Sequence, residues 1–201
     1  MALTRRRLLG AAALGGLAAM AGTGQADASW LVPAVFKKRL TGADLDTASR
    51  WQVAGTDLGI PYVLENGSIG YLFGDTFSGP RPGGPGWRSP VMLRSNVHPG
   101  AAGGVVFDSA AKVAGDGFAP EIMFNAYDTS GNSEFTVIPN DGISFPETGR
   151  QLVSYMSIQQ WYGNQTPAWR TNYAGLAYSD NGNDFIRTDR KSTRLNSSHE
   201  R

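Results

Sequence analysis

Short apolar runs, each interrupted after a few residues by Gly, Pro, Asn or Asp, dominate the chain between residues 29 and 188. No run keeps the 3.6-residue apolar period of an amphipathic helix for three turns, and the best helix candidate is a weak pattern at 37–50. Turn signals recur at short spacing, which predicts an all-β sandwich, barrel or propeller. The predicted strands are 51–54, 60–64, 69–73, 91–95, 104–107, 134–138, 151–157 and 173–178.

The first 28 residues have the pattern of an export signal. Three arginines at 5–7 precede an apolar stretch of small residues at 8–21, and Ala26-Asp27-Ala28 offers a small-x-small cleavage site. The order Thr-Arg-Arg-Arg-Leu-Leu at 4–9 matches a twin-arginine signal. The alternative, a permanent membrane anchor, is weakened because the apolar stretch is short and rich in Gly and Ala. We therefore expect a secreted or cell-envelope protein with no stable membrane anchor after cleavage.

The last residues, 189–201, differ in character from the rest of the chain. The string Asp-Arg-Lys-Ser-Thr-Arg-Leu-Asn-Ser-Ser-His at 189–199 has no apolar periodicity and resembles the translation of a sequencing-library adapter. An ordinary polar, disordered tail is the alternative interpretation. We expect the native sequence to stop near Thr188, which leaves 29–188 as the folded region.

Charge and composition exclude several classes of function for this region. Without the two ends, 11 basic and 14 acidic residues remain, a net charge of about −3, and the only basic cluster is at 37–39. A nucleic-acid-binding protein would need a basic stripe, so nucleic acid is not an expected partner. The chain has no cysteine, and His98 is the only histidine outside the tail. We expect no zinc or other metal site, no cofactor and no cysteine nucleophile.

The stretch 55–77 carries the strongest signal for chemistry. It reads as a hairpin around Asn66-Gly67, with Asp57 and Asp75 at its open end. A two-residue Asn66-Gly67 loop would put Asp75 on the opposite face from Asp57. A three-residue loop that includes Ser68, or one bulge at Gly59 or Gly74, would put both carboxylates on one face.

Two neighbouring carboxylates suit glycoside hydrolysis, in which one stays protonated while the other is ionised. Turn capping by Asp57 and Asp75, or cation binding, is the alternative, since Asp beside Gly is common in β proteins. Glu134, which alternates with Phe135 along a predicted strand, is a third candidate acid or else a solvated edge charge.

Candidate substrate-binding residues are aromatic, cationic or amide side chains that follow Gly-rich or strand segments. Arg88 could bind sugar hydroxyls or orient a carboxylate, and Trp87 could stack on a sugar ring. Both could instead belong to a surface loop that leads into 91–95. A later aromatic concentration is typical of sugar clefts but also of protein cores. The candidates there are Trp161, Tyr162, Trp169 and Tyr173, with Asn172 beside Tyr173. The string Tyr-Ser-Asp-Asn-Gly-Asn-Asp-Phe at 178–185 resembles an Asp-box turn, in which Asp180 has a structural role.

Six motifs in order carry a family resemblance over about 47–185. They are Gly-Thr-Asp-Leu-Gly, Tyr-Leu-Phe-Gly-Asp-Thr-Phe, Trp-Arg-Ser-Pro, Thr-Val-Ile-Pro, Tyr-Met-Ser-Ile-Gln-Gln-Trp and Thr-Asn-Tyr-Ala-Gly-Leu-Ala-Tyr-Ser-Asp. The chain resembles a secreted bacterial family, formerly a domain of unknown function, with endo-D-arabinanase activity. The resemblance implies a five-bladed β-propeller that cleaves D-arabinofuranose linkages in cell-wall arabinan. It also implies that Asp57 and Asp75, and after them Glu134, are catalytic acids.

Complete members of that family are longer than this chain, so the resemblance implies a truncated propeller, the N-terminal portion of the full one. Its unpaired edges would make the chain unstable or inactive by itself. The full-length protein would be a monomer whose partner is D-arabinan. The alternative function is a non-catalytic propeller that binds cell-wall carbohydrate, and a third is a structural or adhesive exported β protein.

Overall fold

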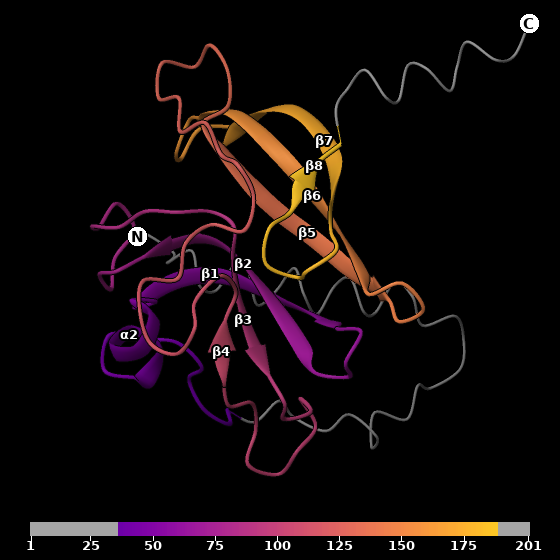
Figure 1. The fold of residues 1–201 in the computed structure, drawn as a ribbon. Coiled ribbons are helices and arrows are strands. Elements are labelled where there is room, and N and C mark those ends of the chain that lie inside the picture. The colour runs from indigo at the N-terminus through magenta and orange to yellow at the C-terminus, as the bar shows by residue number, and fades with distance from the viewer. Residues whose placement is uncertain (1–35, 189–201) are drawn as a thin grey trace, which may run out of the picture. The chain divides into compact units, whose positions relative to one another are not determined.

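The computed structural model describes residues 36–188, and these residues form an almost entirely β structure. A short helix, α2 (Asp46–Trp51), precedes two four-stranded antiparallel sheets (Figure 1). The expected all-β class is confirmed. The export signal expected at 1–28 and the adapter-like tail expected at 189–201 lie outside the described residues.

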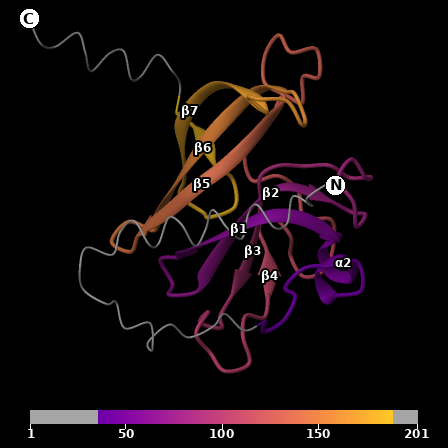
Figure 2. The same cartoon turned by 180° about the vertical axis from the view of Figure 1, so that it is seen from behind.

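The first sheet has the strand order β1-β2-β3-β4, and each strand pairs with the next one along the chain. Its strands are β1 (Gly55–Val63), β2 (Ile69–Phe77), β3 (Val91–Ser95) and β4 (Ser109–Ala110). The second sheet repeats this plan as β5-β6-β7-β8 (Figure 2). Its strands are β5 (Thr136–Phe145), β6 (Arg150–Trp161), β7 (Trp169–Ser179) and β8 (Ile186–Arg187). Repeated four-stranded meanders are the architecture of propeller blades.

One hydrophobic cluster joins the two sheets. Tyr62, Leu72 and Met92 of the first sheet pack with Val153 and Tyr155 of the second. Hydrogen bonds cross the same boundary, because the Tyr62 hydroxyl donates to Oε1 of Gln151 at 2.6 Å. The two sheets therefore share a core.

A second cluster covers the other face of the first sheet. Tyr71 and Phe73 of β2 pack edge-on against Phe107, with ring centroids 5.2 and 5.9 Å apart. Trp51 and Val53, at the end of α2 and just after it, complete the cover and are fully buried.

The predicted helix and two of the predicted strands differ from what the structure shows, and β4 and β8 were not predicted. The helix is six residues long rather than spanning 37–50. The strand predicted at 51–54 is wrong, because Trp51 ends α2 and Gln52 takes a left-handed conformation with φ of 57°. The strand predicted at 104–107 is also wrong, since Val105 and Phe107 are buried in a loop that covers the first sheet. Their apolar character reflects burial and not strand pairing.

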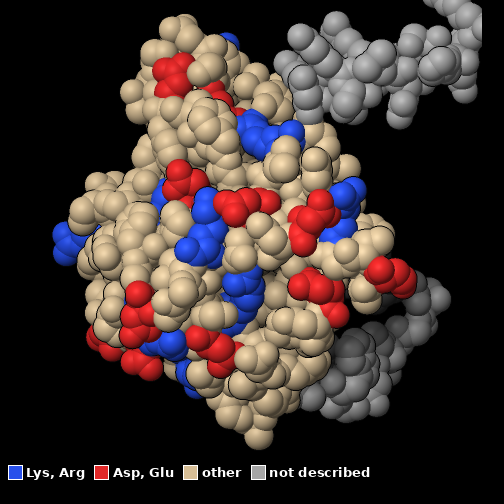
Figure 3. All heavy atoms as spheres, in the orientation of Figure 1, with Lys and Arg blue, Asp and Glu red and all other residues tan. Residues whose placement is uncertain are grey.

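Side chains of both charge signs are interspersed on the face of the molecule drawn in Figure 3, with no continuous basic stripe there. No described helix has the length and apolar character that crossing a membrane would require.

Candidate active site

The structure brings Asp57 and Asp75 together at the open end of the β1–β2 hairpin. Main-chain bonds between Leu64 and Ser68 close a tight loop. The ladder pairs Thr56 with Thr76 and Leu58 with Phe73, so Asp57 and Asp75 both lie at the register shift between these pairs. The backbone N–H of Asp75 donates a hydrogen bond to the Asp57 carboxylate. The loop thus differs from both predicted loops. The carboxyl of Asp57 lies where a Cβ on Gly74 would point, so it lies on the face of Gly74, which alternates with Asp75 along β2.

Glycines and a bulge in the ladder make room for this pair. The register shifts on both sides of Leu58, where Leu58 and Gly59 take positive φ values of 64° and 91°. A Cβ on Gly74 would lie 2.5 Å from Oδ1 of Asp57, so only glycine leaves the space that this carboxylate occupies. A bulge at Gly59 was one of the geometries expected from the sequence.

The surroundings of Asp57 favour its protonated form. Partial removal of water from the carboxyl, and then the negative charge of Asp75, raise the pKa of Asp57 above its usual value. The side chain still reaches solvent and lines a pocket of about 260 Å³ together with Thr56, Gly59 and Tyr71.

Asp75 accepts hydrogen bonds from two neutral donors. Trp87 Nε1 lies 2.9 Å and Thr136 Oγ1 lies 3.1 Å from its Oδ1. Asn125 Nδ2 lies 3.4 Å from the Thr136 oxygen, which leaves the Thr136 hydroxyl hydrogen free to point at Asp75. Thr136 belongs to β5, so the second sheet helps to hold an acid of the first. These donors fix the orientation of the Asp75 carboxylate.

Two predicted substrate-binding residues have other roles in the structure. The ring of Trp87 packs against Tyr127 and Phe135, with centroids 4.9 and 5.1 Å away, and its N–H binds Asp75. Arg88 is 1% exposed and donates to the backbone carbonyls of four residues: Trp51, Gln52, Gly86 and Ala119. The proposed sugar contact by Arg88 is therefore corrected, because its guanidinium is buried and its donors are used within the fold.

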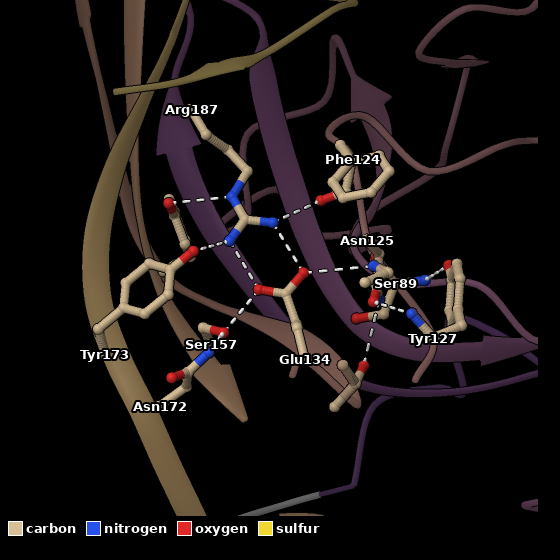
Figure 4. Close-up of polar contacts among 12 residues, drawn as sticks. Ser89, Phe124, Asn125, Tyr127, Glu134, Ser157, Asn172, Tyr173 and Arg187 are labelled. Carbon is tan, nitrogen blue, oxygen red and sulfur yellow. Dashed lines mark hydrogen bonds and ion pairs between the residues drawn. The ribbon is translucent and has the colours of Figure 1, made fainter. Parts of the chain in front are cut away.

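Glu134 is buried in an ion pair that the sequence did not reveal (Figure 4). Its two carboxylate oxygens accept hydrogen bonds from Arg187 at 2.7 and 2.6 Å. Ser157 Oγ, at 2.6 Å, and the N–H of Ala126, at 3.3 Å, donate to the same carboxylate. The alternative of a solvated edge charge at Glu134 is wrong, because the side chain is buried in this ion pair; a catalytic role for Glu134 stays a prediction. Its acceptor positions are occupied by protein donors and it is 5% exposed.

Arg187 is the residue that holds this network together. Besides Glu134, it donates to the Phe124 carbonyl at 3.0 Å, to the Tyr155 hydroxyl at 3.0 Å and to the Tyr173 hydroxyl (Figure 4). Burial acts to lower the pKa of Arg187, but the bonds to Glu134 and Tyr155 outweigh it and raise the pKa above its usual value. The sequence analysis missed Arg187 because its partner, Glu134, lies 53 residues earlier in the chain, and no local sequence pattern indicates a contact over that separation.

A second, larger pocket opens beside this ion pair. It has a volume of about 640 Å³, and Glu134, Asn172 and Tyr173 line it together with Phe124 and Tyr155. Asn172 and Tyr173 therefore lie beside one pocket, as ligand-binding residues would, but next to Glu134 and not at the pocket that Asp57 lines.

Trp161 and Trp169 lie apart from both pockets. They pair across the end of the β6–β7 hairpin and stack in parallel, with centroids 5.4 Å apart and an 8° angle between rings. They are 50% and 39% exposed, so their outer surfaces are open to solvent. Among residues 36–188, no three carboxylate or histidine side chains cluster as metal ligands would.

Comparison with known proteins gives a family and two fungal relatives. A family model described as a domain of unknown function (DUF4185) matches residues 42–201. Notoamide biosynthesis cluster protein J' of Aspergillus versicolor is 54% identical over 168 residues, covering 79% of this chain and 44% of that protein. Notoamide biosynthesis cluster protein J of Aspergillus sp. (strain MF297-2) is 52% identical over 170 residues, covering 79% and 43%. The chain thus spans less than half the length of these curated relatives, whose fungal origin shows that such sequences are not confined to bacteria.

Proposed function

Because the chain belongs to the DUF4185 family and pairs Asp57 with Asp75, we propose that it is part of a glycoside hydrolase that cleaves D-arabinofuranosyl linkages in cell-wall arabinan. One observation carries this proposal: a carboxyl with a raised pKa lies close enough to a second carboxylate to feel its charge, and that carboxylate accepts two hydrogen bonds. Glycosidases use such a pair of unlike acids on either side of the scissile bond.

The different surroundings of the two acids suggest their roles. Asp57, whose protonated form is favoured, is the general acid that donates a proton to the leaving sugar oxygen. Asp75, held by Trp87 and Thr136, is the ionised partner that activates water or attacks the anomeric carbon. No metal or cofactor takes part in this scheme.

The polysaccharide would bind at the two pockets. Leu58 and Gly59 line the pocket of about 260 Å³. At the larger pocket, the ring of Tyr173 could stack on a sugar and the amide of Asn172 could bind its hydroxyls. The signal-like pattern at 1–28 supports an exported protein that meets this substrate outside the cell or in its envelope.

The test is an assay for oligosaccharides released from D-arabinan by a polypeptide that contains residues 36–188. We expect Asp57→Asn and Asp75→Asn each to lower the rate by about 100-fold or more, because each removes one half of the acid–base pair. The control is Asp116→Asn, which changes an exposed carboxylate paired with Arg50 and should leave the rate unchanged. Full activity in either Asp57→Asn or Asp75→Asn would rule out the assignment.

The fungal relatives favour a second candidate function. Their names place them in gene clusters for notoamide biosynthesis, so the same acid pair could act on a small molecule of a biosynthetic pathway. The substrate distinguishes the two candidates, because a small-molecule enzyme would release no oligosaccharides from D-arabinan. Its activity on the small molecule would still depend on both Asp57 and Asp75.

The exposed Trp161–Trp169 pair favours a third, non-catalytic candidate, in which the protein binds carbohydrate through this aromatic surface. Trp161→Ala or Trp169→Ala would then abolish binding in a glycan pull-down, whereas Asp57→Asn would not.

A further inference from the structure

The hydroxyl of Tyr71 is buried without a hydrogen-bond partner. Tyr71 belongs to β2, is 4% exposed and packs its ring edge-on against Phe107. No donor or acceptor in the described part of the chain forms a hydrogen bond with its hydroxyl, and within residues 36–188 only Oγ1 of Thr47 is also buried in this way. A buried polar group without a partner costs free energy, so such groups are rare in folded proteins. The Tyr71 hydroxyl therefore has a hydrogen-bonding capacity that the described part of the protein does not use.

Tyr71 lines the same pocket as the proposed general acid. Tyr71 and Asp57 both line the pocket of about 260 Å³, whereas Thr47 lines neither of the two pockets described above. Three apolar side chains form much of the remaining wall: Leu40, Leu58 and Phe73. A mostly apolar wall with a few polar groups is typical of small-molecule sites. A ligand bound in this pocket would supply the partner that Tyr71 lacks.

The charges around the pocket favour a neutral, hydroxylated ligand. No Lys or Arg among the described residues lines it, and Asp57 is its only carboxyl group. The surroundings of Asp57 raise its pKa and favour the protonated form, which attracts a cation weakly. Burial raises the pKa of Tyr71, so its phenol stays neutral and can donate or accept a hydrogen bond. Thr41 adds a second hydroxyl that forms no hydrogen bond within residues 36–188.

Backbone strain lies beside the same pocket. Leu58 and Gly59 line it and have positive φ values of 64° and 91°. This conformation is unfavourable for a branched residue such as Leu58, and strained residues of this kind cluster at ligand-binding sites. The Leu58 side chain is apolar yet 55% exposed, so it can pack against C–H groups of a ligand.

We propose that this pocket holds a single sugar unit and that the Tyr71 hydroxyl forms a hydrogen bond with an oxygen of that sugar. The sugar is a D-arabinofuranosyl unit beside the bond that is cleaved, an identity that rests on the proposed function. The volume of about 260 Å³ is below the range of about 300–1,000 Å³ that is common for drug-sized ligands, which suits one ring rather than several. A furanose ring has hydroxyls for Tyr71 and Thr41 and C–H groups for the apolar wall. Tyr71 is thus a substrate-binding residue next to Asp57.

NMR titration of the 201-residue chain, labelled with ¹³C at its tyrosine rings, tests the proposal with a methyl D-arabinofuranoside as the probe. The ring signals of Tyr71 should shift as the sugar is added. Tyr71→Phe should raise the Kd of the probe about ten-fold, because it removes one hydrogen bond and keeps the ring. Its Tm should not fall, since the hydroxyl that is removed has no partner within residues 36–188.

Thr47→Val is the matched control, because it also removes a buried hydroxyl without a partner but does so outside the pocket. The Kd of the probe should be unchanged in this variant. A Kd for Tyr71→Phe within two-fold of the wild type would overturn the proposal. So would a titration in which the signals of Tyr173, at the larger pocket, shift while those of Tyr71 stay in place.

The outcome is separate from that of the proposed hydrolysis. Binding of the probe that depends on Tyr71, in a protein that releases no oligosaccharides from D-arabinan, would support the sugar pocket and contradict the hydrolase. Release of oligosaccharides with a Kd that does not depend on Tyr71 would support the hydrolase and overturn the role of Tyr71.

Discussion

Asp57 and Asp75 carry the same functional group in different surroundings, and the difference comes from single neighbouring residues. Trp87 and Thr136 donate hydrogen bonds to Asp75, whereas Asp57 faces partial loss of water and the charge of Asp75. Trp87 was expected to stack on a sugar ring and instead has its ring packed against Tyr127 and Phe135. At the residue scale, then, the contacts made by a side chain decide its role more than its type does.

The raised pKa of Asp57 predicts a pH-dependent effect of Asp57→Asn on stability. The ionised carboxyl is less favourable in the folded protein than in the unfolded chain, so folding stability falls as pH rises from about 3.9, the unfolded pKa, through the higher folded pKa. The variant avoids this cost. Its Tm should exceed that of the wild type at pH 7, and the gain should vanish below about pH 4, where both states of Asp57 are protonated.

Differential scanning calorimetry across this pH range provides the measurement. Asp116→Asn, in which an exposed carboxylate paired with Arg50 is lost, should show no such gain at pH 7. Equal Tm values for Asp57→Asn and wild type at pH 7 would mean that the surroundings of Asp57 do not favour its protonated form.

At the scale of single elements, the β1–β2 hairpin sets the geometry of the acid pair. Its loop fixes the register, and the bulge at Leu58 and Gly59 shifts the ladder next to Asp57. The turn at 178–185 is a comparable case. Asn181, rather than Asp180, accepts the backbone N–H groups of Asn183 and Asp184, while Asp180 pairs with Arg150.

Gly74→Ala should disable the acid pair while leaving the hairpin folded. A Cβ there would lie 2.5 Å from Oδ1 of Asp57, so the carboxylate must leave its position beside Gly74. A displacement of this kind costs about 100-fold in rate. In an NMR titration, the pKa of Asp57 should also fall toward its ordinary value, a readout that needs no substrate.

Gly103→Ala is the matched control, because a Cβ at Gly103 meets nothing within 4 Å. Wild-type activity and an unchanged Asp57 titration in Gly74→Ala would show that the close approach of Gly74 does not position Asp57.

For residues 38–188 as a whole, the two sheets form one compact unit because they share a core. The Tyr62 hydroxyl bonds to Gln151 Oε1, and Gln151 Nε2 donates to Glu65 at 2.6 Å, so a buried polar chain also links the sheets. Tyr62→Phe leaves the Gln151 oxygen without this donor and should lower the free energy of unfolding by about 1–3 kcal/mol.

Urea unfolding followed by both far-UV circular dichroism and tryptophan fluorescence measures this effect. Tyr162→Phe is the control, since the Tyr162 hydroxyl has no hydrogen bond within the described part of the chain, and its midpoint should not move. Both probes should report one transition, and separate transitions for the two sheets would contradict a shared core.

The sequence by itself determined the all-β class, because alternation of apolar residues and turn chemistry act over a few residues. The strand 91–95 and most of the other strands followed from this local pattern, as did a hairpin with Asp57 and Asp75 at its open end. Only the tertiary structure decided which side chains meet across long separations. It buried Arg88 and Glu134, paired Glu134 with Arg187, placed Thr136 on Asp75 and turned 104–107 from a predicted strand into a cover for the first sheet. Such contacts depend on how the two sheets pack together. Burial between them gives a charged residue a structural role, and the residues next to it in the sequence do not indicate this.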